Sequence, residues 1–220
     1  MSLSPQEQNS LPITPKRNTV YLFIKRAIDI LASSLALIFL SPIFALTAIA
    51  IKIEDPRGKV FFAQERYGIG CVPFRMYKFR SMYSNAESLL SQLTPKQRAE
   101  WDTSFKFDKD PRITKVGAFI RKVSIDELPQ LVNILFAQMS IVGPRPPLLV
   151  EKDAYGKTLP LVMSVKPGLT GYWQAYGRSD IPHEERITMN LFYIENMSLL
   201  FDIKIIFRTA IGIFKGGGAK

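Results

Sequence analysis

Cysteine and histidine are almost absent from this 220-residue sequence, which holds one of each, Cys71 and His183. A single cysteine excludes an internal disulfide and a cysteine-based zinc site. One histidine gives no support to a Ser-His-Asp triad, a Cys-His dyad or a multi-histidine metal site. His183 follows Pro182 in a polar stretch, so we expect it in a surface loop. Any chemistry is therefore expected from carboxylates, cations and a divalent ion such as Mg²⁺.

The sequence also lacks the two common glycine-rich phosphate loops. No GxxxxGK[ST] segment is present, and residues 68–73 (GIGCVP) lack the third glycine of a dinucleotide-binding fingerprint. A nucleotide, if one binds, is therefore expected to bind in neither the P-loop nor the Rossmann manner.

Negative charge is scarce relative to positive charge. The sequence holds 29 Lys and Arg against 19 Asp and Glu, which gives a formal net charge of +10. Such a balance favours anionic partners: nucleic acid, an acidic membrane surface or phosphorylated substrates. The charge alone does not choose among them.

One segment, from Leu31 to Ile51, carries no charge and is about as long as the ~20 residues that span a bilayer. Pro42 in its middle predicts a sharp bend, and Ser41 can satisfy part of the freed backbone. Lysines and arginines flank both ends, so the positive-inside rule places both ends in the cytoplasm. We therefore favour a re-entrant helix over an ordinary kinked transmembrane helix. The run is too long for a typical cleaved signal peptide.

The sequence divides into four parts. These are a polar tail (1–19), the membrane helix (20–52), a cytosol-facing domain (53–215) and a flexible end (216–220). In the third part, residues 59–64 and 74–82 predict two strands around a glycine-containing turn.

The remaining patterns are helical. Residues 84–101 predict helical pieces broken at Pro95, and a second helix is expected over 124–139, before the irregular segment 143–147. Residues 199–214 are apolar over a wide arc, which fits an amphipathic helix in a membrane interface or a helix covering a core.

The stretch most informative about chemistry is residues 121–129, RKVSIDELP. Ser124 and Glu127 fit an S-x-x-E capping box, and on local pattern this structural interpretation is favoured. Capping leaves Asp126 unexplained. In the first turn of a helix, Asp126 would be favoured in its ionised form, which makes it a candidate nucleophile. Glu127 is then the candidate ligand of Mg²⁺.

A site that handles phosphate also needs cations to neutralise the phosphoryl oxygens. Arg145 is the strongest candidate because the prolines around it stiffen its backbone. Taken singly, each candidate cation is most often a solvated surface charge. The rings of Trp173 and Tyr176 offer a surface for stacking on a base, although core packing is their default role. The candidate cations are Lys78, Arg80, Arg121, Arg145 and Arg178.

The order of motifs from Lys25 to Phe214 resembles the bacterial sugar transferase family, the monotopic polyprenyl-phosphate phosphoglycosyl transferases. The motifs that carry the resemblance are KRAIDI, Ser41-Pro42, VFFAQERYG, FRMYKFRSM, DPRITKVGAFIRKVSIDELPQLVNIL, MSIVGPRPP, VKPGLTGYWQAYGR and YIENMSLLFDIKI. So many motifs in one order make a chance match improbable.

The resemblance implies an α/β, mainly helical, membrane-associated domain with an N-terminal re-entrant helix bent at Ser41-Pro42 and interfacial amphipathic helices. It implies that Asp126 attacks the sugar-linked phosphate of a UDP-sugar, releases UMP and passes the phosphosugar to polyprenyl (undecaprenyl) phosphate. Glu127 is implied to bind Mg²⁺, and the cations to bind substrate phosphate. The resemblance places the enzyme among membrane lipids on the cytoplasmic face of the bacterial inner membrane, at the first membrane step of surface glycan assembly.

Three finer expectations follow from the same resemblance. The chain corresponds to a small form without a preceding bundle of transmembrane helices, and a homodimer is one candidate assembly. The stretch GRSD at residues 177–180 is similar to members that transfer galactose or glucose phosphate. A donor with an N-acetylated sugar is the alternative.

Other functions stay open on the residues alone. Direct transfer without a covalent intermediate is one, and a membrane-anchored scaffold whose basic surface holds anionic lipid is another. A nucleic-acid-binding protein is not expected, because the helix predicted over 124–139 is mainly apolar and acidic in its early turns.

Overall fold

The computed structural model describes residues 18–90, 110–177 and 181–214. The described part is mixed α/β and mostly helical, as predicted. Its strands are β1 (Phe61–Tyr67), β2 (Pro73–Phe79), β3 (Ser140–Val142) and β4 (Gly168–Thr170). Its helices are α1 (Thr19–Phe39), α2 (Ser41–Glu54), α3 (Ala86–Leu90), α5 (Lys115–Lys122), α6 (Gln130–Leu135), α7 (Lys152–Tyr155), α8 (Leu159–Val162), α9 (Tyr172–Tyr176), α10 (His183–Glu195) and α11 (Leu199–Phe214).

Several predicted features lie outside the described residues. They are the tail up to residue 17, the part of the predicted helical segment 84–101 that follows α3, Arg178 and the end at 216–220. The last residues of the predicted tail belong to the start of α1 instead. Asn18 caps that helix, because its side-chain oxygen accepts hydrogen bonds from the backbone N–H groups of Val20 and Tyr21 at 3.1 and 3.2 Å.

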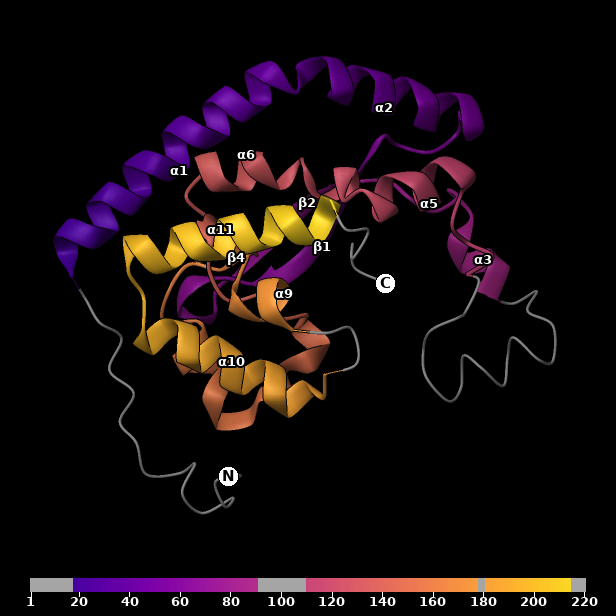
Figure 1. Cartoon of the computed structure of the whole chain (residues 1–220). Helices are drawn as coiled ribbons and strands as arrows, with labels where there is room; N and C mark the ends of the chain where they lie inside the picture. Colours follow the sequence, from indigo (N-terminus) through magenta and orange to yellow (C-terminus); the bar gives the residue numbers. More distant parts are fainter. Residues whose placement is uncertain (1–17, 91–109, 178–180, 215–220) are drawn as a thin grey trace.

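Helices α1 and α2 meet at a 59° bend, where Ser41 and Pro42 predict one. Pro42 has no N–H to offer the carbonyl of Ile38 four residues before it. The Ser41 hydroxyl donates to that carbonyl instead, at 2.8 Å. Among the described residues no single helix is long and apolar enough to cross a membrane, whereas this bent pair passes together by length and composition. The pair arches over the rest of the molecule (Figure 1).

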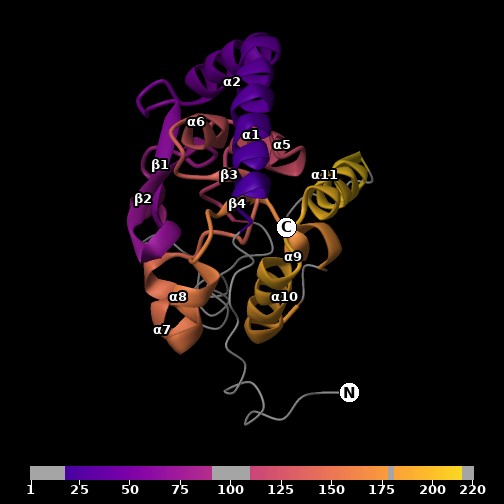
Figure 2. The same ribbon diagram turned by 90° about the vertical axis from the view of Figure 1, so that its left-hand side faces the viewer.

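The underside of the arch packs on the rest of the domain, with α6 beneath α1 and α5 beneath α2 (Figures 1 and 2). Ala36 and Leu37 of α1 pack on a buried cluster formed by Met76, Leu131, Ile134 and Met139. Phe44 of α2 packs on Phe79 of β2, with 5.2 Å between ring centroids. Apolar burial on these inner faces fixes the arch to the domain.

The predicted hairpin is confirmed with slightly shifted bounds. Strands β1 and β2 pair antiparallel, with Phe61 opposite Phe79 and Tyr67 opposite Pro73. Gly70 supplies the positive φ of 65° in the turn between them. A second sheet, in which β3 and β4 pair in parallel, has no predicted counterpart because each strand is only three residues long.

Helix α11 has the predicted bounds and two different faces. Ile205 is fully buried, whereas Ile203 and Phe207 are more than half exposed. Asp202 joins α11 to α1 and α10. Its carboxylate accepts hydrogen bonds from the hydroxyls of Tyr21 and Tyr193 at 2.9 and 2.8 Å and pairs with Lys25 at 2.6 Å.

The expected surface-loop position of His183 is wrong, because this residue opens α10. Pro182 in front of it has an extended backbone (φ −55°, ψ 152°), which ends the loop there. The imidazole then packs edge-on against Tyr155, with 5.0 Å between ring centroids.

The helix predicted over 124–139 is also wrong in extent. Ser124 has a left-handed backbone (φ 58°) and makes no side-chain capping bond, so the predicted capping box does not form. A short 3-10 turn follows over Ile125–Glu127, then α6, which ends before Ala137 with its positive φ of 61°. Two left-handed residues therefore confine the α-helix to the middle of the predicted segment.

Candidate active site

A cavity of about 860 Å³ lies between β2, the end of α5, the 3-10 turn at Ile125–Glu127 and the segment 143–147. The structure brings together in its wall every described residue that the sequence singled out for catalysis or phosphate binding. The carboxylates that line it are Glu87, Asp126 and Glu127. The cations that line it are Lys59, Arg66, Lys78, Arg80, Arg112, Arg121 and Arg145. The excess of cations makes the cavity a site for anions.

Asp126 reaches the cavity because α5 is seated closely against the end of β2. Thr114 caps α5 by accepting a hydrogen bond from the N–H of Gly117 at 2.8 Å. A Cβ on Gly117 would collide with the carbonyl oxygen of Ser81, so a larger residue would push the helix away. The left-handed Ser124 then turns the chain, and Asp126 lies 8% exposed.

Burial raises the pKa of the Asp126 carboxyl, and the charge of Glu127 raises it further. Lys78 and Arg121 act in the opposite direction and lower the pKa. We expected the start of a long helix to favour the ionised form of Asp126. A 3-10 turn and a six-residue helix take the place of that long helix. The effect of burial on the pKa of Asp126 is therefore larger than any effect of the helix start. The two cations offset part of the effect of burial on the Asp126 carboxyl.

Glu127 lies closer to solvent than Asp126. Its Oε1 pairs with Lys78 Nζ at 2.7 Å, and its side chain is 34% exposed. No group of three or more His, Cys, Asp or Glu able to hold a metal occurs in the described part of the chain. Mg²⁺ commonly binds through one or two carboxylates together with substrate phosphates. Glu127 in an anion cavity fits an ion of that kind, one that arrives with a pyrophosphate.

Arg80 lines the cavity, but its outer nitrogens face Asp55, not the cavity centre. They donate to the Asp55 carboxylate and the Asp55 carbonyl, both at 2.7 Å. The Ser84 N–H, also bonded to that carboxylate at 2.7 Å, is the main cause that lowers the pKa of Asp55. Sequence reasoning missed Asp55, which stands directly after α2 and shortly after the predicted membrane helix. Arg80 therefore ties the end of α2 to the cavity wall.

Two further polar contacts hold the wall in place. Arg121 Nε donates to the Ser81 hydroxyl at 2.8 Å, which fixes α5 relative to β2. Asn133 of α6 is fully buried, accepts from the Tyr77 N–H at 3.0 Å and donates to the Arg75 carbonyl at 2.8 Å. Asn133 thus locks the strand that carries Lys78 to the segment that carries Asp126. No pattern in the sequence marked it.

The segment 143–147 presents Arg145 as predicted, with Pro144 and Pro146 buried on either side of it. Its guanidinium carbon lies 5.6 Å from the centre of the Trp173 ring. Trp173 is only partly buried, so core packing does not describe it.

Arg66 on β1 is a cation that sequence reasoning missed, although it lies within VFFAQERYG. It is 6% exposed and donates to the Pro146 carbonyl at 3.1 Å. Burial, followed by the charge of Arg145, lowers the pKa of Arg66 to about 10. Through its hydrogen bond to the Pro146 carbonyl, Arg66 holds the segment 143–147 in place.

The arrangement, a buried carboxylate faced by cations with no cysteine or histidine in the wall, suits chemistry at phosphate. Residues 20–216 match the family described as bacterial sugar transferase. The chain belongs to this family.

Individual relatives cover different lengths of their own chains. The undecaprenyl-phosphate galactose phosphotransferase of Salmonella typhimurium is 41% identical over 90% of this chain, which spans 42% of that relative. The UDP-N-acetylgalactosamine-undecaprenyl-phosphate N-acetylgalactosaminephosphotransferase of Aeromonas hydrophila is 41% identical over 91% of this chain and 46% of its own length. The exopolysaccharide production protein ExoY of Sinorhizobium fredii is 42% identical over 84% of this chain and 83% of its own length.

Proposed function

We propose that this chain transfers a sugar 1-phosphate from a UDP-sugar to undecaprenyl phosphate and releases UMP. The observation that carries the proposal is the buried Asp126 carboxylate, which faces Lys78 and Arg121 in a large basic cavity. The names of the Salmonella and Aeromonas relatives supply the carrier and the type of donor.

The proposed reaction has two displacements at the sugar-linked phosphorus. An Asp126 oxygen forms a bond to this phosphorus while the bond between the phosphorus and the bridging oxygen of the diphosphate breaks. The bridging oxygen keeps the electron pair and leaves as part of UMP. A phosphate oxygen of undecaprenyl phosphate then bonds to the same phosphorus. The bond to Asp126 breaks and the carboxylate is restored.

The cavity residues divide the work between them. Lys78, Arg121 and Arg145 bind and orient the diphosphate oxygens, while Arg66 and Arg80 hold the wall from which they project. Mg²⁺, when bound with the substrate at Glu127, would neutralise charge on the diphosphate. Lys78 holds the Glu127 carboxylate at the cavity rim until then.

We propose that the donor carries a hexose, galactose or glucose, because the sequence GRSD at residues 177–180 is similar to family members that transfer those sugars. An N-acetylated sugar is the alternative. Relatives named for galactose and for N-acetylgalactosamine are equally similar to the chain, at 41% identity. A panel of donors therefore belongs in the first experiment.

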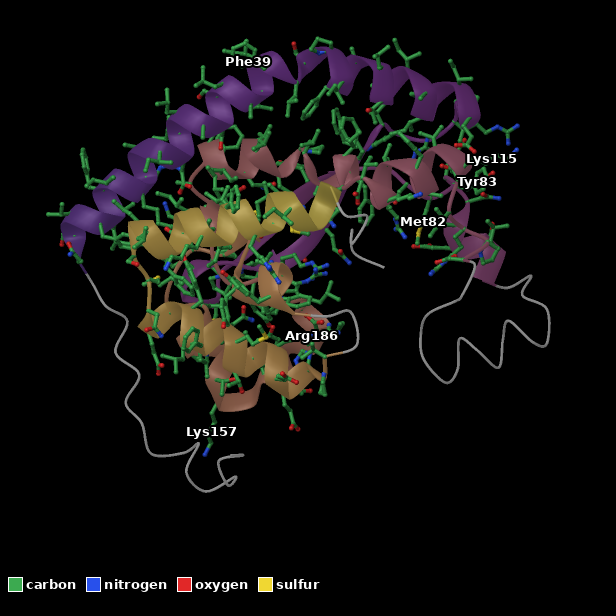
Figure 3. The ribbon with its side chains drawn as sticks, viewed as in Figure 1. Phe39, Met82, Tyr83, Lys115, Lys157 and Arg186 are labelled. Atoms are coloured by element: carbon green, nitrogen blue, oxygen red, sulfur yellow. The ribbon has the colours of Figure 1, made fainter. Side chains whose placement is uncertain are left out.

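We also propose that α1 and α2 enter the cytoplasmic face of the bacterial inner membrane as a re-entrant pair, with α11 in the interface. Support comes from the 59° bend and from large apolar side chains that are at least 61% exposed. Phe39, at the bend, projects outward from the arch, whereas Lys157 lies at the opposite end of the molecule (Figure 3). On α1, α2 and α11 these exposed apolar residues are Val20, Phe23, Leu31, Ile38, Phe39, Leu46, Ile53, Leu200, Ile203 and Phe207.

The test is UMP release by the purified chain in lipid nanodiscs with Mg²⁺, undecaprenyl phosphate and a panel of UDP-sugars. The matched variants are Asp126→Asn and Asp153→Asn, because Asp153 is an exposed aspartate on α7. We expect release with one or a few donors, lost in Asp126→Asn and kept in Asp153→Asn. If the folded protein releases no UMP with any donor of the panel, or if Asp126→Asn keeps full activity, the proposal is overturned.

A further inference from the structure

A second cavity, of about 430 Å³, shares no lining residue with the candidate active site. Three segments meet around it: the first half of α1, the start of β3 and the segment before β4. The Ser140 N–H donates to the Pro167 carbonyl at 2.8 Å, which places Lys166 beside Ser140. The Ile141 N–H donates to the Asp29 carboxylate at 2.9 Å, which brings α1 to the same place.

The wall of this cavity is largely apolar. Leu22, Ile69, Val142, Val165, Tyr193 and Met197 form that part of it. Leu22 is 43% exposed and its neighbour Phe23 is 75% exposed. The cavity therefore borders the exposed apolar surface of α1, where an alkyl chain can leave it.

Two polar groups in the wall lack a partner among the described residues. Ser140 is only 1% exposed, and its buried hydroxyl makes no hydrogen bond with the described residues. Lys166 is partly buried and makes no ion pair with the described residues. Burial and the charge of Arg26 lower its pKa, while the charge of Asp29 acts in the opposite direction. Buried polar groups are normally satisfied, so the unsatisfied Ser140 hydroxyl, beside a lysine without an ion pair in the same cavity, points to a ligand.

The other charged groups of the cavity are already engaged. Lys25 pairs with Asp202 at 2.6 Å, and Arg26 donates to the carbonyls of Ile134 and Leu135 at 2.6 and 2.8 Å. Asp29 accepts from Ile141. An oxyanion next to Lys166 and Ser140 would accept a hydrogen bond from each and offset the repulsion between Lys166 and Arg26.

We propose that this cavity binds the phosphate head group of a lipid, with the oxyanion at Lys166 and Ser140 and the alkyl chain leaving past Leu22. Apolar walls beside two oxyanion donors match an amphiphile, not a second sugar nucleotide. The site is separate from the catalytic cavity and gives the protein a contact with individual phosphate-headed lipids.

The test uses the full chain in detergent and dihexanoyl phosphatidylglycerol, a short-chain lipid whose binding needs no bilayer. Native mass spectrometry or titration calorimetry gives the dissociation constant. We expect Lys166→Gln to weaken binding by about tenfold or more, because it removes a charge-assisted contact. Lys157→Gln, which changes an exposed lysine that does not line the cavity, leaves binding unchanged. Equal affinity of the wild type and Lys166→Gln would overturn the proposal.

Ser140→Ala separates a ligand role from a structural one. This variant removes an unsatisfied buried hydroxyl, so we expect unfolding at the same or a higher temperature together with weaker lipid binding. Stronger or unchanged lipid binding in Ser140→Ala would count against the proposal.

Three further ligands identify the source of the phosphate. Dihexanoyl phosphatidylcholine keeps the phosphate but adds a positive choline beside Lys166, and we expect weaker binding than for phosphatidylglycerol. Geranyl phosphate binding more tightly, with the same loss in Lys166→Gln, would support the site and assign it to prenyl phosphates. Inorganic phosphate binding as tightly as the lipids would overturn the assignment to a lipid. Transfer activity does not enter these measurements, so their outcome is independent of the proposed reaction.

Discussion

Lys78 Nζ lies 2.7 Å from Glu127 Oε1 and also lowers the pKa of the neighbouring Asp126. One lysine on β2 therefore acts on two of the three carboxylates that line the candidate site. It holds Glu127 in place and favours the ionised form of a carboxylate whose burial disfavours ionisation.

Replacing Lys78 by Gln is expected to shift the acidic limb of the activity profile to higher pH. In the proposed reaction Asp126 must be ionised to attack, and without Lys78 its pKa is expected to rise further above the ordinary value. Activity is then lost at a higher pH as the solution is acidified. The measurement is kcat/KM for UMP release across pH, with Lys157→Gln as the control at an exposed position. An unshifted acidic limb would contradict the assigned role of Lys78.

Asp126→Asn is expected to unfold at the same or a higher temperature than the wild type at neutral pH. A carboxyl with a raised folded-state pKa costs stability once it ionises, above its unfolded-state pKa. The difference should shrink as pH falls and the wild-type carboxyl takes up its proton. Thermal unfolding at neutral and mildly acidic pH checks this. Clear destabilisation of Asp126→Asn at neutral pH would show that the carboxylate serves the fold.

Asp202→Ala is expected to destabilise the protein by about 3–5 kcal/mol, because it leaves Lys25 buried without its partner and removes the acceptor of two tyrosine hydroxyls. Lys204→Ala, on the same helix and exposed, should change stability by less than about 0.5 kcal/mol. Chemical unfolding of the three proteins gives both values. Equal effects of the two substitutions would contradict the role given to Asp202.

The re-entrant arrangement predicts that both ends of the α1–α2 pair label from the same side. Cys71 is the only cysteine, so a Cys71→Ser background carrying Asn18→Cys or Arg57→Cys reports each end separately. Both positions are exposed. In sealed inside-out vesicles, an impermeant thiol reagent should label both. Labelling of one end from each side would show a membrane-spanning pair.

Local signals in the sequence were enough for some elements and not for others. The bend at Ser41-Pro42 and the hairpin followed from proline, glycine and alternation, which act over a few residues. The prediction of a helix over 124–139 failed because Ser124 has a left-handed backbone. This residue follows α5, whose Gly117 lies close to Ser81, a contact between distant segments. The local S-x-x-E capping pattern gives no information about a contact between distant segments.

The residues of the candidate site were likewise predicted only in part. Motif order brought together Asp126, Glu127, Lys78, Arg80, Arg121 and Arg145. It did not show that Arg80 faces Asp55, that Arg66 lies beneath the proline segment, or that Asn133 locks β2 to α6. These are long-range hydrogen bonds, and a single sequence carries no local trace of them.

The most direct test of the central claim is a search for a covalent adduct on Asp126. The purified protein would be mixed with its UDP-sugar donor and Mg²⁺ without undecaprenyl phosphate, quenched and digested for peptide mass spectrometry. A mass increase equal to one sugar phosphate on the peptide containing Asp126, removed when undecaprenyl phosphate is added and absent in Asp126→Asn, is the predicted result. Turnover with no such adduct and with undiminished rate in Asp126→Asn would contradict the claim and indicate direct transfer between the two substrates.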